Sequence, residues 1–178
     1  MDRRLFLLSG LTLAGLALAG CASVPKAPTG FKPLTLVDAF AGRSTGEGHF
    51  KVWLTGDERR FTAHLNGHVT GKAGARRLTV VEDFIYADGE KNRLTWVFDE
   101  QGAGRWTGKR EDTVGYAEVI EADGAIRLTY TADFASPSGV NRLGFSDVIY
   151  DAGDRLINDA IVTKSGIPVA SVQFVITR

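Results

Sequence analysis

A G-x-S-x-G pattern occupies residues 42–46 and is the first stretch whose residue types could do chemistry. Its serine would act as a nucleophile only on a turn between a strand and a helix, with an acid and then a histidine later in the chain. Here no apolar strand precedes Ser44, and the last histidine is His68. Because the chain contains 21 glycines, chance matches are expected. We therefore interpret the pattern as a coincidence.

Two histidines could form a metal site or an acid–base pair. If the Gly-Asp at residues 56–57 makes a two-residue turn, His49 faces His64 across a hairpin. Two opposed imidazoles could bind Zn²⁺ together with Glu47 or a third histidine, His68. Lys51 would place a positive charge beside them and disfavour a cation. We therefore expect a polar pair that faces solvent, and no metal.

Four carboxylates, Asp88, Glu90, Glu111 and Asp112, could serve in acid–base chemistry or bind Ca²⁺ if the fold brings them together. Asp88 precedes a glycine, which is typical of a hairpin turn and favours a structural role. The sequence contains no Walker loop, dinucleotide fingerprint or C-x-x-C motif. We therefore expect no cofactor.

The single cysteine, Cys21, has the clearest chemical interpretation. It follows Leu-Ala-Gly at residues 18–20, behind an apolar run and the pair Arg3 and Arg4. This arrangement predicts a lipoprotein signal peptide over residues 1–20 and a cysteine that accepts diacylglycerol. We expect residues 21–33, which contain several prolines, to be a lipidated tether that attaches the protein to a membrane.

The residue after the cysteine is Ala22 rather than aspartate, which favours the outer membrane, on its periplasmic face. The two arginines fit either an ordinary secretory signal or a twin-arginine signal, and the sequence leaves both routes open. The formal net charge of the chain is +0 and no basic surface is evident, so we expect no nucleic-acid partner. With one cysteine there is no disulfide framework, and stability must come from packing.

The elements that position these residues are predicted to be β-strands, because apolar and polar residues alternate with period two from Thr45 onward. Turn signals such as the Asp-Gly at residues 88–89 separate the runs. About ten strands, spaced roughly 10 to 13 residues apart, predict an all-β antiparallel meander. An open sheet of that size would expose its edges, so we predict a lipocalin/calycin-like barrel over residues 34–178. Within it, residues 34–41 fit either a short helix or a lid segment.

Some strands place polar and apolar residues on the same face, which indicates polar groups inside the barrel or a second apolar surface outside it. Buried charges must be paired. We expect most of these charges to project into solvent. The candidates for internal pairs are Arg93, Arg127 or Arg142 with Glu82, Asp147 or Asp159.

Aromatic residues on the predicted strands fit the wall of an apolar pocket and an ordinary core equally well. If there is a pocket, we expect Arg93 or Lys164 to meet a carboxylate head group of the ligand. The aromatic residues expected to line the pocket are Tyr86, Trp96, Tyr130 and Tyr150.

The stretches at residues 86–90 (YADGE) and 93–96 (RLTW), with 46–50 (GEGHF), 111–115 (EDTVG) and 164–166 (KSG), resemble a known bacterial lipoprotein family, domain of unknown function 3833. The resemblance covers nearly the whole predicted domain. It implies a lipoprotein of the cell envelope and supplies no reaction.

Three functions remain open from the sequence. The first is a lipid-anchored barrel that binds a fatty acid or another apolar molecule. The second is an enzyme that acts on lipid, with Asp112, Asp147 or the pair His49 and His64 as acid or base. The third is a structural accessory that docks another envelope protein. We expect binding rather than catalysis.

Overall fold

The structure is a computed structural model of the chain and describes residues 25–26, 29–30, 32–136 and 139–178. The expected signal peptide at residues 1–20 and the lipidation site Cys21 lie outside the described residues, as does most of the expected tether. The described residues form one short helix and ten strands: α1 (Leu36–Phe40), β1 (Gly42–Val52), β2 (Glu58–Thr70), β3 (Arg77–Tyr86), β4 (Lys91–Gly102), β5 (Arg105–Lys109), β6 (Ala117–Ala122), β7 (Ala125–Ser136), β8 (Gly139–Asp151), β9 (Leu156–Lys164) and β10 (Ile167–Thr177).

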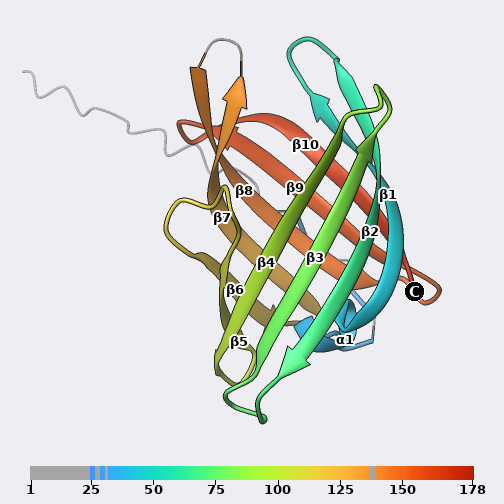
Figure 1. The fold of residues 1–178 in the computed structure, drawn as a ribbon, viewed down its shortest axis with the longest axis vertical. Helices are drawn as coiled ribbons and strands as arrows, with labels where there is room; N and C mark the ends of the chain where they lie inside the picture. Colours follow the sequence, from blue (N-terminus) through green and yellow to red (C-terminus); the bar gives the residue numbers. More distant parts are fainter. Residues whose placement is uncertain (1–24, 27–28, 31, 137–138) are drawn as a thin grey trace, which may run out of the picture.

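The strands form a closed antiparallel barrel (Figure 1). Each strand pairs with the next one along the chain, and β10 returns to pair with β1 from Thr45↔Thr177 to Val52↔Ala170. The prediction of an all-β meander that closes into a calycin-like barrel is confirmed.

The period-two pattern separates the inside of the barrel from the outside. On β2, Ala63 and Leu65 are buried, whereas the intervening His64 and Asn66 are exposed. Successive side chains of a strand point to opposite faces, so one face supplies the interior and the other meets solvent. The turns follow the predicted chemistry, and at residue 89 the glycine adopts φ +86°, which L side chains rarely adopt.

Helix α1 covers one end of the barrel (Figure 1). Its N-cap Thr35 accepts a hydrogen bond from the backbone N–H of Asp38, and Leu36 and Ala39 are buried in the core. The backbone N–H of Leu36 donates to Oε1 of Glu121 at 2.7 Å, which ties the helix to β6. The stretch for which the sequence allowed a short helix thus contains one, and it closes the barrel at that end.

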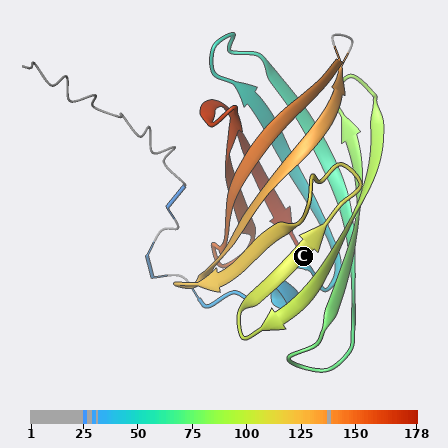
Figure 2. The same cartoon turned by 90° about the vertical axis from the view of Figure 1, so that its left-hand side faces the viewer.

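The other end of the barrel carries the connections β1–β2, β3–β4, β7–β8 and β9–β10 (Figure 2). The core is divided into a larger cluster that includes Leu36, Trp96 and Trp106, and a smaller one around Ala132 and Phe145. Within the described residues, no helix is long and apolar enough to cross a membrane.

Candidate functional site

The barrel encloses a cavity of about 410 Å³. This volume lies within the range of small-molecule sites, which are roughly 300–1,000 Å³. Phe40 of α1 lines the cavity at the covered end, and Arg59 and Tyr86 line it near the opposite end. The wall between them is mainly aromatic and aliphatic: Phe50, Phe61, Val80, Phe84, Leu94, Trp96, Phe98, Leu128, Tyr130, Phe134, Leu143, Phe145, Ile149, Ala160, Val172, Phe174 and Ile176.

The aromatic side chains of the wall contact one another and hold its shape. The ring of Tyr130 stacks on Phe145 with centroids 4.7 Å apart and meets Trp96 edge-on at 5.1 Å. Phe61 meets Phe84 edge-on at 5.5 Å and Phe174 at a tilt at 5.4 Å. Such pairs add stability beyond the area that they bury.

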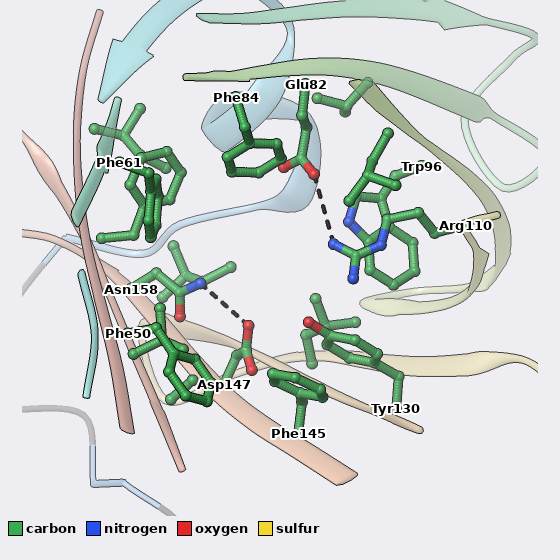
Figure 3. Close-up of a pocket in the computed structure, with 18 of the residues that line it drawn as sticks. Phe50, Phe61, Glu82, Phe84, Trp96, Arg110, Tyr130, Phe145, Asp147 and Asn158 are labelled. Atoms are coloured by element: carbon green, nitrogen blue, oxygen red, sulfur yellow. Dashed lines mark hydrogen bonds and ion pairs between the residues drawn. The ribbon is translucent and has the colours of Figure 1, made fainter. Parts of the chain in front are cut away.

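A buried arginine, Arg110, lies at the cavity with its guanidinium beside two aromatic rings that contact each other (Figure 3). Its Cζ is 4.8 Å from the ring centre of Trp96 and 5.4 Å from that of Tyr130, which is cation–π distance. Its Nε and Nη2 donate to the two carboxylate oxygens of Asp112 at 2.7 and 2.9 Å. Its Nη1 lies 3.7 Å from Oε2 of Glu82.

Local structure fixes the position of Arg110. It directly follows β5, on which Trp106 and Gly108 face inward, so the alternation directs residue 110 into the barrel. A Cβ at residue 108 would lie 2.6 Å from the ring of Phe98, so glycine lets that ring pack there. The turn after β5 is held by two hydrogen bonds between Arg110 and Thr113.

A second polar group, Asp147 on β8 with Asn158 on β9, lies opposite Glu82 in the cavity (Figure 3). The side-chain amide of Asn158 donates to Oδ2 of Asp147 at 3.1 Å. Asp147 is 6 % exposed and Glu82 is 8 % exposed.

Burial changes the protonation of these interior groups. It raises the pKa of Glu82 from 4.5 to about 7, although the positive charge of Arg110 acts in the opposite direction. It likewise raises the pKa of Asp147 from 3.8 to about 7, against the hydrogen bond from Asn158 and the charge of Arg110. Burial also raises the pKa of Tyr130, so that hydroxyl stays protonated.

Three buried oxygens in this cavity have no hydrogen-bond partner among the described residues: Oε2 of Glu82, Oδ1 of Asp147 and Oδ1 of Asn158. Buried polar atoms are nearly always hydrogen bonded in folded proteins. These three are therefore polar atoms that a bound molecule can satisfy, and all three are acceptors when the two acids are ionised.

Arg59 lies at the end of the cavity away from α1. Its Cζ lies 3.7 Å from the ring centre of Tyr86, and its Nη2 donates to Oδ2 of Asp88 at 2.9 Å and also pairs with Glu90. The side chain of Arg59 is 42 % exposed, so the cavity meets solvent here. This end is the mouth of the cavity, formed where β2, β3 and β4 meet their hairpin turns.

The sequence model of one protein family, described as a protein of unknown function (DUF3833), matches residues 15–178. The chain belongs to this family. The match spans the whole barrel, which confirms the resemblance seen in residues 86–96. No curated protein matched the sequence.

In this DUF3833 protein, three of the residues expected to line a pocket do line the cavity, namely Tyr86, Trp96 and Tyr130. Tyr150 does not, and its hydroxyl donates to Oδ2 of Asp159 at 3.3 Å. The reason is register: Ile149 faces the cavity, so its neighbour faces outward.

The two cations expected to meet a carboxylate head group lie elsewhere. Arg93 pairs with Asp83 on the outer face of the barrel, with Nη2 to Oδ2 at 3.0 Å. Lys164 is exposed and donates to Oδ1 of Asn141 at 2.9 Å. Neither side chain lines the cavity. Arg93 falls on the outward phase of β4, whereas Lys164 is the last residue of β9 and lies at the rim, beyond the residues that line the cavity.

Of the six charges considered for internal pairs, only Glu82 and Asp147 are inside. The cation that accompanies them in the interior is Arg110. The sequence pattern does not predict it, because Arg110 follows the short strand β5, where too few residues alternate to show which way its side chain points. The signal in the sequence that could have identified Arg110 is its position four residues after Trp106, which puts both side chains on the same face of the strand. The remaining four residues, Arg93, Arg127, Arg142 and Asp159, do not line the cavity.

The predicted pairing of His49 with His64 is wrong. Residues 53–57 make a longer turn, which shifts the register so that His49 pairs with Arg60 and His64 pairs with Thr45. In the part of the chain that the structure describes, no group of three histidine, cysteine, aspartate or glutamate residues could hold a metal ion.

The other candidate motifs are also separated. Residues 42–46 lie within β1, so Ser44 is on a strand and on no nucleophile turn. Asp88 and Glu90 are at the mouth, whereas Asp112 is bound to Arg110. The carboxylate of Glu111 instead accepts the backbone N–H of residue 95 at 2.8 Å.

Proposed function

We propose that this protein binds one apolar molecule inside its barrel while an N-terminal lipid on Cys21 holds it at the periplasmic face of the outer membrane. The observation that carries the binding proposal is the cavity of about 410 Å³, whose wall is mainly aromatic and aliphatic. Burial of apolar ligand surface against such a wall is favourable by about 25 cal/mol per Å².

The arrangement of the cavity also fits a ligand that enters from one end. Helix α1 covers the lower end, and the exposed side chain of Arg59 marks the mouth at the other. A molecule that enters past Tyr86 would pass along the aromatic wall before it reaches Glu82 and Asp147. The apolar part is then held by the wall, and the polar part is recognised at depth.

A cavity-filling variant tests binding. The side chain of Ala160 lines the cavity and is 3 % exposed, so Ala160→Phe places a ring in the cavity. Ile161→Phe is the matched control, because the next residue on β9 faces outward. The chain carrying Cys21→Ser, which cannot accept the lipid, is the background for both.

We expect native mass spectrometry of the background chain to show a co-purified apolar molecule. In a separate fluorescence titration, we expect the chain to bind N-phenyl-1-naphthylamine and added lipid to displace it. Ala160→Phe should abolish both signals, and Ile161→Phe should retain them. A background chain that neither carries an adduct nor binds the probe would contradict the proposal.

The anchor has a separate test. The mass of the N-terminal peptide should show a diacylglycerol on Cys21, and the protein should fractionate with the outer membrane. Cys21→Ser should move it to the soluble periplasmic fraction. An unmodified cysteine in the mature protein would refute the anchor and leave the binding proposal intact.

A further inference from the structure

When its two acids are ionised, the interior of the barrel presents an excess of hydrogen-bond acceptors to its ligand. The three unpaired atoms are all oxygens, on Glu82, Asp147 and Asn158. Glu82 projects from β3, and the other two project from β8 and β9 on the opposite wall (Figure 3). A molecule that lies between the two walls can contact both groups.

Arg110 does not satisfy these acceptors. Two of its guanidinium nitrogens are bound to Asp112, and the third stays 3.7 Å from Glu82, beyond hydrogen-bond distance. The carboxylate of Asp112 also offsets the single charge of the arginine. The two other interior acids, Glu82 and Asp147, therefore have no remaining full positive charge to balance them in this cluster.

This balance decides which head groups can be bound at depth. A fatty-acid carboxylate would bring more acceptors and a further negative charge next to two carboxyl groups, and like charges at close range are unfavourable. A head group with N–H or O–H donors would instead meet the unpaired oxygens. The three N–H donors of a primary ammonium match the three acceptors in number.

We propose that the ligand is an amphiphile whose head group donates hydrogen bonds and carries no negative charge, bound between Glu82 and Asp147 with its chain along the aromatic wall. This inference rests on the proposed binding function and names the class of ligand. It replaces the fatty-acid carboxylate expected at Arg93 or Lys164, since neither side chain lines the cavity.

A series of probes with one chain and four head groups tests the inference on the Cys21→Ser chain. The probes are dodecylamine, dodecanol, laurate and methyl laurate, each titrated by displacement of N-phenyl-1-naphthylamine below its micellar concentration. The titrations are made at pH 8.5, where both interior acids are ionised because their pKa is about 7. We expect dodecylamine and dodecanol to bind at least tenfold more tightly than laurate and methyl laurate. Laurate that binds as tightly as either donor would overturn the inference while leaving the binding function standing. If none of the four binds, the binding function itself fails, and this inference fails with it.

Two variants locate the head group. Glu82→Gln and Asp147→Asn should each weaken dodecylamine about tenfold and leave methyl laurate unchanged. Asp83→Asn is the matched control, because the next residue on β3 lies on the outer face, paired with Arg93. Where either variant is misfolded by circular dichroism, Asn158→Ala removes one acceptor without changing the charge and should weaken both donor probes. Equal affinities in the control and in the interior variants would contradict the assigned position.

Discussion

Nη1 of Arg110 lies 3.7 Å from Oε2 of Glu82 inside the barrel, while Asp112 occupies the other side of the guanidinium. The arginine is thus held by one acid and faces another. Because charges of this kind are stable at depth only when they are compensated, the cluster links the stability of the barrel to the protonation of its interior.

Loss of the interior cation should destabilise the protein strongly. Arg110→Met keeps much of the side-chain volume but leaves Asp112 and Glu82 buried without a positive partner. Removal of one partner from a buried pair costs about 3–5 kcal/mol, and urea unfolding at pH 7 measures it. Arg93→Met is the control, since its ion pair with Asp83 is exposed and screened by solvent, so its loss should change the stability little. Equal losses in the two variants would show that the interior pair has no special role.

The free energy of unfolding should fall as the pH rises from about 4 to about 7. In the folded protein Glu82 and Asp147 keep their protons up to a pKa of about 7, whereas in the unfolded chain they release them near 4.5 and 3.8. The folded state therefore binds more protons within this window, so raising the pH favours unfolding. Urea denaturation at pH 4.5, 5.5, 6.5 and 7.5 should show the decline, followed by a plateau.

The double variant Glu82→Gln with Asp147→Asn should flatten that decline. Acids with a lowered pKa affect the stability at lower pH. The hydrogen bond from Arg76 is the main cause that holds the pKa of Glu100 at about 2, so the contribution of Glu100 to the free energy of unfolding is lost only as the pH falls below about 4.5. A decline of the same slope in the double variant would assign it to other groups.

Helix α1 should depend on one acceptor. Oε1 of Glu121 receives the backbone N–H of Leu36 at 2.7 Å and the indole N–H of Trp106 at 2.9 Å. Glu121→Ala leaves both donors unpaired, and we expect a loss of about 2–4 kcal/mol, with faster hydrogen exchange in residues 36–40. Glu121→Gln retains an acceptor and should cost less than half as much. Similar losses for the two variants would exclude this explanation.

The close approach of α1 to β2 requires a glycine. A Cβ at Gly67 would lie 1.7 Å from the carbonyl oxygen of Phe40, so the backbone would have to move. We expect Gly67→Ala to destabilise the protein by about 1–3 kcal/mol, in the range of overpacking. Thermal unfolding should show little change for Asn66→Ala, on the exposed face of the same strand. A Gly67→Ala protein as stable as that control would mean that the helix is not seated as described.

The strands and their closure could be predicted from the sequence because both follow from local rules. The alternation that predicts β2, for example, separates Ala63 and Leu65 from their exposed neighbours. The number of strands then makes closure the favourable way to remove the edges. The aromatic positions Trp96 and Tyr130 were predicted on the same basis.

Which charged side chains lie inside the barrel depends on strand lengths and on the register between strands, and the alternation of apolar and polar residues does not determine these. Arg110 becomes the interior cation because β5 is short and the chain turns at Thr113, where a hydrogen bond fixes the turn. Arg93 has an equally plausible sequence context, yet one step of phase puts it outside. For His49 and His64 the length of a single turn decided the register, and turn length is poorly determined by the residues at 53–57.

The seam between β1 and β10 joins the two ends of the domain. Thr45 pairs with Thr177, so the contacts that complete the cylinder bring together positions from opposite ends of the chain. Such contacts require the largest loss of chain entropy during folding, and proteins rich in them fold in milliseconds to seconds. The seam should therefore form late, after the consecutive hairpins, and a chain emerging from its site of synthesis could not complete the barrel until β10 is available.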